Sequence, residues 1–551
     1  MSRAIGSNLV AAGIFLSRIA GLIRNMMIGV VLGGQPAVTD ALNFAMRLPN
    51  LLQNLLGEGA LSASFIPVYA KLVEEKRDRE ADDLAGVVVT LLALVTAVIV
   101  LAAVLLARPL VWLFTDWEAD PAKYELTITL TRVTTVGIGF LVISAWCLGI
   151  LNSHRSFFLS YVAPVVWNVA QIAVLVLFGL LNWRLEDIAV AVAWAVVAGG
   201  LLQLLIQMPR VRRLAPTVRP NLVRTAASRD VLRRFAPAIG ARGVVQLSSY
   251  VDLVLATIFL VTGALTWYSF SLPLYLLPIS LFGFSVAAAE LAEMSRRSDN
   301  LEVVSARLQP ALRRVLIPAG FITAAYLAAS PTFVDALYGW PSRLFGKEGL
   351  QDPTKITTIA LVVTAFAVGL PATMTARVTQ NTLYSLGDVK GPAKIAVVRV
   401  VISALAGLVL ILQLDWLTFS DGQIVAFGDF PHWPPWERVP TARRVSDAIP
   451  HLGAVGLGLG ASLSAWVEWG LLRRLLRRRL QAPIRSGWAR PVTVAAVAAG
   501  VWMFATAGLH LPSPIDALAA GTTGLLVYAG GLWLQGIRPT RPPRQGLASS
   551  P

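Results

Sequence analysis

Apolar runs about 20 residues long recur along almost the whole chain, and polar stretches separate them. A run of this length crosses the hydrocarbon core of a bilayer as one α-helix. We count about fourteen runs, which begin near residues 8, 36, 84, 126, 157, 186, 235, 262, 312, 356, 392, 450, 489 and 513. The pattern therefore predicts an all-α polytopic membrane protein with about 14 transmembrane helices.

The composition agrees with this class of protein. Of the 551 residues, 56% are hydrophobic and 14% are charged, and the mean hydropathy is +0.66. A soluble domain carries more charge on its surface than this. The first run, residues 8–32, is too long for a signal peptide, so we expect it to be a true span. The single cysteine, Cys147, lies in an apolar run and cannot form an internal disulfide.

The net charge of +16 at pH 7 is explained by the way basic residues are distributed between loops. If the loops alternate and the N-terminus is cytoplasmic, the basic clusters at residues 209–224, 295–314 and 473–485 all fall inside. The outside loops hold few basic residues, namely Lys123, Arg184, Arg343, Lys347, Lys355, Arg438, Arg443 and Arg444. The positive-inside rule accounts for this asymmetry without a nucleic-acid partner. Attraction to anionic lipid is an expected side effect.

Two pairs of segments suggest an internal repeat. Residues 44–65 resemble residues 270–291, which lie 226 positions later, and residues 149–169 resemble residues 381–401, which lie 232 positions later. We interpret the pairs as parts of two six-span halves with two spans appended. Because six is even, both halves enter the membrane from the same side and the repeat is parallel. The alternative is a chance likeness between polytopic segments.

The repeat predicts the domain organisation. We expect an N-lobe at residues 1–229, with spans one to six and a basic cytoplasmic loop, and a C-lobe at residues 230–480, with spans seven to twelve. Residues 481–537 are expected to form the last two spans, and residues 538–551 a disordered tail. Two halves that rock against each other are what alternating access requires.

Five charged residues lie in the first two predicted spans, where a central charge costs about 2.5–3.5 kcal/mol. They are Arg18 and Arg24 in the first span and Asp40, Arg47 and Glu58 in the second. Pro49, Gly57 and Gly59 are expected to break the second span. Broken helices at membrane depth are tolerated where they line a cavity.

Three arginines against two carboxylates give such a cavity a net positive charge. This favours an anionic substrate, and the planar fork of arginine suits phosphate oxygens best. The alternative is purely structural: Arg18 and Arg24 pair with Asp40 and Glu58 and lock two helices together.

Five motifs carry a resemblance to a known family. They are SRIAGLIRNMMIG (17–29), TDALNFAMRLPNLL (39–52), GEGALSASFIPVYA (57–70), LNSHRSFFLSYVAPVVWNV (151–169) and TLYSLGDVKGPAKIA (382–396). In this order they resemble the MurJ (MviN) family of lipid II flippases, within the multidrug/oligosaccharidyl-lipid/polysaccharide exporter superfamily. The likeness runs over nearly the whole chain.

The resemblance implies a transporter of the bacterial inner membrane that turns the lipid-linked peptidoglycan precursor from the inner to the outer leaflet. Arg18, Arg24 and Arg47 would hold the diphosphate of that lipid. Asp40 and Glu58 would orient these arginines and gate the cavity. Expected partners are the diphosphate lipid, the membrane and proteins of cell-wall synthesis.

The chain also departs from the family pattern. Gln53 and Asn54 stand where the family usually has two basic residues, and Leu272 and Pro273 stand where span eight usually has an Asp-Arg pair. Three readings remain open: the first lobe alone binds the substrate, the substrate differs, or the protein does not transport. Another polyprenyl-linked glycan and a role as a cell-wall assembly scaffold are therefore alternatives, whereas a positive cavity disfavours a cationic drug.

Asp252 in span seven matches a family position associated with a sodium site. It could couple an ion to transport, or it could form an ion pair with Arg399. The membrane potential and a cation gradient are both possible driving forces. The four histidines lie far apart without ligand spacing, and no nucleophile–base arrangement occurs, so we expect no metal, no cofactor and no enzymatic activity.

Overall fold

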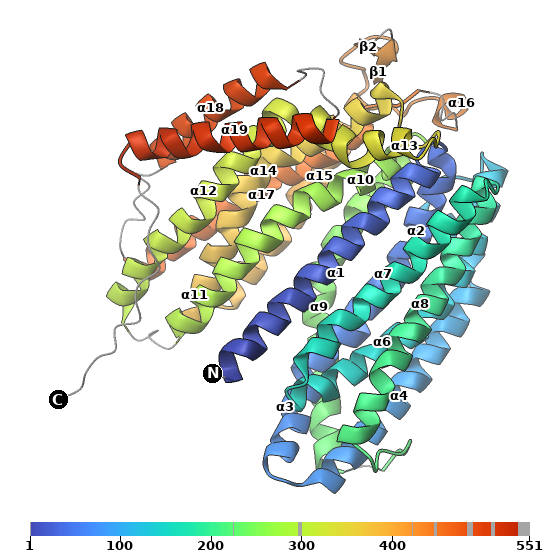
Figure 1. Ribbon diagram of the computed structural model, residues 1–551, viewed down its shortest axis with the longest axis vertical. Coiled ribbons are helices and arrows are strands. Elements are labelled where there is room, and N and C mark those ends of the chain that lie inside the picture. The colour runs from blue at the N-terminus through green and yellow to red at the C-terminus, as the bar shows by residue number, and fades with distance from the viewer. Residues whose placement is uncertain are drawn as a thin grey trace. The chain divides into compact units, whose positions relative to one another are not determined.

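The computed structural model describes residues 2–223, 225–295, 300–420, 422–445, 449–481, 489–507 and 513–537. Within these ranges the side chains at residues 2–12, 14, 48–49, 57–60, 62–63, 236–249, 288, 292–293 and 420 are outside the description. The predicted tail at residues 538–551 also lies outside it. The described chain is almost entirely helical, which confirms the all-α fold class (Figure 1).

The chain forms two compact units. The first comprises Met1–Phe270, Pro341–Thr358 and Gly407–Leu457, and the second comprises Ser271–Trp340, Ile359–Ala406 and Gly458–Pro551. The lobe boundaries near residues 229 and 480 stay a prediction.

The first unit contains the N-terminal helices and a β-hairpin. Its elements are α1 (Ser2–Leu32), α2 (Pro36–Leu52), the π-helix η1 (Gln53–Gly59), α3 (Ala60–Glu74), α4 (Asp78–Leu105), α5 (Ala107–Phe114), α6 (Pro121–Ser153), α7 (Phe157–Leu180), α8 (Leu185–Leu214), α9 (Ala226–Phe259), β1 (Leu417–Ser420), β2 (Gln423–Ala426) and α16 (Thr441–Arg444). The antiparallel hairpin pairs Leu417 with Ala426. Helix α8 packs against both α6 and α7, which run alongside it in Figure 1.

The second unit contains the π-helix η2 (Ile279–Phe284), α11 (Ser285–Ser295), α12 (Leu301–Val334), the π-helix η3 (Asp335–Gly339), α18 (Ala489–Thr506) and α19 (Ser513–Leu534). Five helices contribute residues to both units: α10 (Ala264–Pro278), α13 (Trp340–Leu344), α14 (Pro353–Ser385), α15 (Lys390–Leu414) and α17 (Gly453–Leu480).

Twelve helices within the described ranges are long and apolar enough to cross a membrane. They coincide with twelve of the predicted runs. The other two runs, near residues 36 and 235, fall on α2–η1–α3 and on α9, which are helical as well. The exact number of 14 spans stays a prediction.

Helix boundaries repeat at the offsets found in the sequence. The π-helices η1 and η2 begin 226 residues apart. Helices α6 and α14 have 33 residues each, and both ends of α14 lie 232 residues after those of α6. Since π-turns inside α-helices are rare and gather at functional sites, their recurrence at the same place in two spans supports a duplicated architecture.

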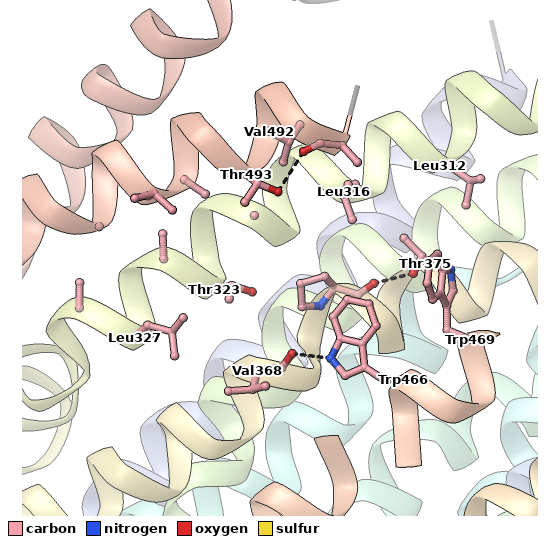
Figure 2. A pocket seen from close by; sticks show the side chains of 18 of the residues that line it. Leu312, Leu316, Thr323, Leu327, Val368, Thr375, Trp466, Trp469, Val492 and Thr493 are labelled. Atoms are coloured by element: carbon pink, nitrogen blue, oxygen red, sulfur yellow. Dashed lines mark hydrogen bonds between the residues drawn. The ribbon is translucent and has the colours of Figure 1, made fainter. Parts of the chain in front are cut away.

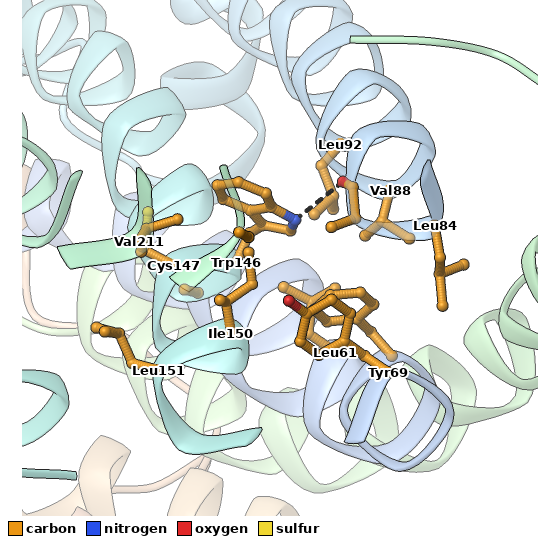
Figure 3. Close-up of a cluster of buried hydrophobic side chains, with 14 of the residues drawn as sticks. Leu61, Tyr69, Leu84, Val88, Leu92, Trp146, Cys147, Ile150, Leu151 and Val211 are labelled. Atoms are coloured by element: carbon orange, nitrogen blue, oxygen red, sulfur yellow. Dashed lines mark hydrogen bonds between the residues drawn. The ribbon is translucent and has the colours of Figure 1, made fainter. Parts of the chain in front are cut away.

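An apolar core holds α3, α4 and α6 of the first unit together (Figure 3). Trp146 lies at its centre, and its indole nitrogen donates to the backbone oxygen of Ala85 at 3.1 Å. Tyr69, Leu84 and Cys147 are almost fully buried around it. Cys147 is a packing residue of this core, because a thiol buried in apolar surroundings is unreactive.

Candidate functional site

The two arginines of α1 have no carboxylate partner among the described side chains. Arg18 is exposed. Arg24 is half-buried, its guanidinium carbon lies 5.0 Å from the centre of the Trp167 ring on α7, and Nη2 donates to Asn25 Oδ1 at 3.2 Å. The buried Nε of Arg24 has no hydrogen-bond partner in the described part of the chain. Neither charge is paired with a carboxylate that the structure describes, and the role of both arginines in anion binding stays a prediction.

Asp40 on α2 has a quite different environment. The residue is 1% exposed and its carboxylate accepts four hydrogen bonds. Oδ2 accepts from Lys123 Nζ at 2.9 Å and from the Gly263 amide at 2.8 Å. Oδ1 accepts from the amide and the hydroxyl of Thr266, at 2.8 and 2.6 Å. We call this arrangement of Asp40, Lys123, Gly263 and Thr266 the Asp40 clasp.

Local sequence explains why Lys123 points into the clasp. Asp120 caps α6 by accepting from the Lys123 amide at 3.1 Å, and Pro121 occupies the first turn, so Lys123 lies on the first turn of the helix. Its ammonium also donates to Thr262 Oγ1 at 3.2 Å and lies 3.8 Å from the ring centre of Trp117. An ammonium that is buried needs this many partners to offset its lost hydration.

The other end of the clasp depends on one glycine. Gly263 has φ +94°, a region that residues with a Cβ avoid, and a Cβ there would lie 3.1 Å from Pro36 Cβ. This conformation turns the chain between α9 and α10 so that the first amides of α10 reach Asp40. A carboxylate at a helix N-terminus is stabilised by the helix dipole as well as by the amides.

Three expectations from the sequence are corrected here. Asp40 does not orient an arginine, because the described donors that reach it are a lysine, a threonine and backbone amides. The structural alternative, in which Arg18 and Arg24 pair with Asp40 and Glu58, is wrong at Asp40 for the same reason, and its Glu58 part lies outside the described side chains. Lys123 is not a loop residue but part of α6.

The remaining predicted residues of the first unit are placed as follows. Arg47 is half-buried, its backbone oxygen accepts from Tyr250 Oη at 2.6 Å, and its guanidinium forms no ion pair with a residue that the structure describes. Glu58 lies in η1, and its side chain is outside the described residues. The roles of Arg47 in binding and of Glu58 in gating stay predictions.

Asp252 is half-buried on α9 and accepts a hydrogen bond from Tyr268 Oη at 3.1 Å. Arg399, its predicted structural partner, forms an ion pair with Glu468 of α17 at 2.7 Å. Ion coupling at Asp252 and its pairing with Arg399 both stay predictions.

The connection between α9 and α10 is also held by the loop that precedes α17. Arg438 and Arg444 both donate to Asp116 Oδ2, at 2.5 and 2.7 Å. The Arg444 oxygen accepts from the Thr262 amide at 2.8 Å. Two segments far apart in sequence therefore fix the residues that form the Asp40 clasp.

Asp415 lies directly after α15 and is 2% exposed. Neither of its carboxylate oxygens accepts a well-formed hydrogen bond from a described residue. The backbone amides of Val261 and Gly453 lie near the carboxylate. Burial raises the pKa of Asp415 to about 8, against smaller opposing effects of these amides and of the Arg444 and Arg438 charges.

The second unit contains a cavity of about 790 Å³ between α12, α14, α17 and α18 (Figure 2). Its walls are mostly apolar, with Leu316, Leu327 and Val492 among the lining residues. Trp466 borders it and donates from its indole nitrogen to the Val368 oxygen at 2.9 Å. A cavity of this size and polarity suits a hydrocarbon chain.

Sequence reasoning missed Lys123, and it missed Arg377 of α14 and Glu468 of α17 as charged residues at membrane depth. The Asp120-Pro121 pair was a usable signal for Lys123, because it marks a helix start. Arg377 and Glu468 lie singly in apolar runs, and nothing in the local sequence shows what surrounds them.

The sequence of this chain is similar to those of known membrane transporters. Residues 30–427 match the family described as "Lipid II flippase MurJ". The chain belongs to the MurJ family. It is 28% identical over 546 residues to the lipid II flippase MurJ of Burkholderia cenocepacia, with 95% of each chain covered. It is 27% identical over 478 residues to the probable lipid II flippase MurJ of Rickettsia prowazekii, covering 86% of this chain and 83% of that relative.

Solved structures show the same fold. A lipid II flippase MurJ in an inward closed conformation matches with a TM-score of 0.73 and 17% identity, covering 96% of this chain and all of the other. An inward-facing multidrug resistance MATE transporter of the MOP superfamily matches with a TM-score of 0.61 and 16% identity. The match covers 84% of this chain and 94% of the transporter. The resemblance that the motifs predicted is confirmed, and the chain is a multi-pass membrane protein of this superfamily fold.

Removing one partner of the Asp40 clasp should have unequal effects. Asp40→Ala leaves a buried ammonium without a counterion and should lower the free energy of unfolding by about 3–5 kcal/mol. Lys123→Met leaves Asp40 with its other donors and should cost about 1–3 kcal/mol. In the double variant neither charge remains, so its cost should be smaller than the sum. Unfolding in detergent measures all three.

The matched control is Arg108→Met, which breaks an ion pair with Glu125 whose side chains are both 55% exposed. It should change stability by less than about 1 kcal/mol. Strictly additive costs for Asp40→Ala and Lys123→Met would contradict the buried pair.

Asp415 should make the stability of the protein fall as pH rises. An unfolded Asp loses its proton near about pH 4. Since the folded pKa is raised to about 8, the folded state binds more protons than the unfolded state between these values. The free energy of unfolding of Asp415→Asn, minus that of the parent protein, should therefore increase by more than about 1 kcal/mol from pH 5 to pH 8. The exposed Asp429 of the same loop provides the control Asp429→Asn, which should show no such difference.

Proposed function

We propose that this protein is a lipid II flippase that moves the lipid-linked peptidoglycan precursor from the inner to the outer leaflet by alternating access. It would work in a bacterial inner membrane with its N-terminus in the cytoplasm and would make or break no covalent bond. The observation that carries the proposal is membership of the MurJ family over most of the chain.

The geometry of the two units fits an amphiphilic anion. In the first unit, Arg18 and Arg24 have no described carboxylate partner, so their charges can hold the diphosphate together with Arg47. In the second unit, the apolar cavity can receive part of a polyprenyl chain. Each feature by itself suits one part of an amphiphilic lipid, the arginines its charged head and the apolar cavity its hydrocarbon tail.

Asp40 would act as a gate and not as a ligand. Its carboxylate holds the start of α10, a helix whose first residues belong to the first unit and whose later residues belong to the second. On the proposed topology this end of the helices faces the outside. Release of the substrate there would require the Asp40 clasp to open, and its hydrogen bonds would form again when the site returns to the cytoplasmic side.

The energy source is proposed to be the membrane potential or a cation gradient. Asp252, a half-buried carboxylate on α9, is the candidate coupling residue for the second case. Proteins of cell-wall synthesis are proposed as partners on the outer side, where the flipped precursor is consumed.

One observation favours a second candidate. Span eight carries Leu272 and Pro273, both uncharged, where the family usually has an Asp-Arg pair. A chain with this change could flip another polyprenyl-linked glycan, or it could act as a non-transporting scaffold for cell-wall assembly.

The deciding experiment uses a bacterium depleted of its own flippase and measures lipid II exposed on the outer leaflet. Expression of this protein should restore exposure. A well-inserted protein that restores none would favour another glycolipid or the scaffold, and a second lipid-linked glycan tested in the same cells would separate these two.

Arg18 should be needed for transport but not for folding. Because its guanidinium is exposed and forms no ion pair with a described residue, Arg18→Ala should leave the thermal stability unchanged. It should reduce lipid II exposure by tenfold or more, a loss of at least about 1.4 kcal/mol of substrate binding. Undiminished exposure would remove Arg18 from the site.

Filling the cavity should block transport. Ala496 lines it, so Ala496→Phe places a ring where the polyprenyl chain would lie and should reduce lipid II exposure at equal protein level. Leu518→Phe on α19 is the control, because Leu518 is 68% exposed and does not line the cavity. If Leu518→Phe reduces exposure as strongly, the effect comes from the added bulk at the lipid surface and not from the cavity.

A further inference from the structure

Arg377 of α14 is a charged residue of the second unit that the proposed mechanism does not use. It is half-buried, and its guanidinium carbon lies 5.3 Å from the centre of the Phe284 ring, at the end of η2. Nη1 donates to Gln380 Oε1 at 3.3 Å, and among the described residues Arg377 forms no ion pair. An ionised side chain inside a membrane-spanning helix normally marks a functional site.

Arg377 has two charged neighbours in the second unit, one basic and one acidic. Arg399 of α15 and Glu468 of α17 lie within electrostatic reach of it. Glu468 is already engaged by Arg399 at 2.7 Å, and its side chain is 5% exposed. Glu468 is therefore not available to Arg377, and no described residue forms an ion pair with the Arg377 guanidinium.

The polar residues on α14 hold the guanidinium in place. Gln380 Nε2 donates to Tyr384 Oη at 2.7 Å while Gln380 Oε1 accepts from Arg377. Positions 377, 380 and 384 follow the helical spacing that places side chains on one face. The hydroxyl hydrogen of Tyr384 is left to donate elsewhere, so Arg377 and Tyr384 offer donors on the same face.

The depth of the site agrees with the expected path of the substrate. Arg377 lies eight residues before the end of α14, and Arg399 lies nine residues after the start of α15. At 1.5 Å per residue both are about 12–14 Å from the connection between these helices. On the proposed topology that connection is cytoplasmic, so the site is on the side of the leaflet from which the substrate comes.

We propose that Arg377, with Tyr384 as a second donor, binds the phosphate groups of a phosphorylated polyprenyl lipid as it enters from the cytoplasmic leaflet. The inference rests on the proposed function and extends it, because it gives the second unit its own contact with the headgroup. The planar guanidinium binds two phosphate oxygens at once, which an ammonium cannot do. Span eight, with Leu272 and Pro273, then needs no basic residue, since α14 supplies the charge beside its π-helical segment η2.

The test measures binding of a polyprenyl diphosphate, and of the matching uncharged polyprenol, to the purified full-length protein. Arg377→Gln should weaken polyprenyl diphosphate binding about tenfold and leave polyprenol binding unchanged. Arg377→Lys should recover part of the loss, because it keeps the charge but not the fork. Lys394→Gln, which removes an exposed positive charge from α15, is the matched control and should bind both lipids like the parent protein.

Each result decides the proposal. Parent-like binding of the diphosphate by Arg377→Gln overturns it, and so does an equal loss of both lipids, which would show a structural role. The flippase-depletion assay separates this site from the proposed function. If the parent protein restores no lipid II exposure but Arg377→Gln still loses diphosphate binding selectively, the function fails and the site stands. If the parent protein restores exposure and Arg377→Gln binds normally, the site fails and the function stands.

Discussion

A charge inside a bilayer must be paired, hydrated or kept for a ligand, and this constraint governs the arrangement of the whole chain. Two of these solutions are seen in the described residues: pairing, and charges without a carboxylate partner. Asp40 and Lys123 are almost completely buried and satisfy each other, together with the first amides of α10. Arg399 and Glu468 form a similar pair in the second unit. Arg18, Arg24, Arg47 and Arg377 have no described carboxylate partner, and these are the residues that we propose as anion ligands.

The second and eighth spans are not broken but continue through π-helical segments, which are subject to the same constraint. A π-helix leaves backbone groups less regularly paired than an α-helix, so in a membrane it persists only against protein or a wet cavity. Here η1 and η2 interrupt two spans at positions 226 residues apart. Glu58 lies within η1, and the ring of Phe284 at the end of η2 is covered by the guanidinium of Arg377. The two π-helices begin at the offset of the predicted repeat, while the charged residues around them differ.

Selectivity for an amphiphile needs both a polar and an apolar contact. The cavity between α12, α14, α17 and α18 is mostly apolar. Arg377 of α14, by contrast, lies near the ion pair between Arg399 of α15 and Glu468 of α17. One helix therefore has residues in both kinds of environment, with Thr375 lining the cavity and Arg377 two positions further along. Two positions correspond to about 200° around a helix, so these side chains face opposite sides.

The sequence by itself determined the all-α membrane fold and the family, because these depend on local properties: run length and motif order. It also identified Arg18, Arg24, Asp40, Arg47 and Glu58 as charges that need an explanation. Only the tertiary structure decided which charges are satisfied. Asp40 and Lys123 are 83 residues apart, and Arg399 and Glu468 are 69 apart, so their pairing depends on helix packing that no local pattern encodes. For the same reason Arg377, a single arginine in an apolar run, became visible as a candidate anion ligand only once its neighbours were known.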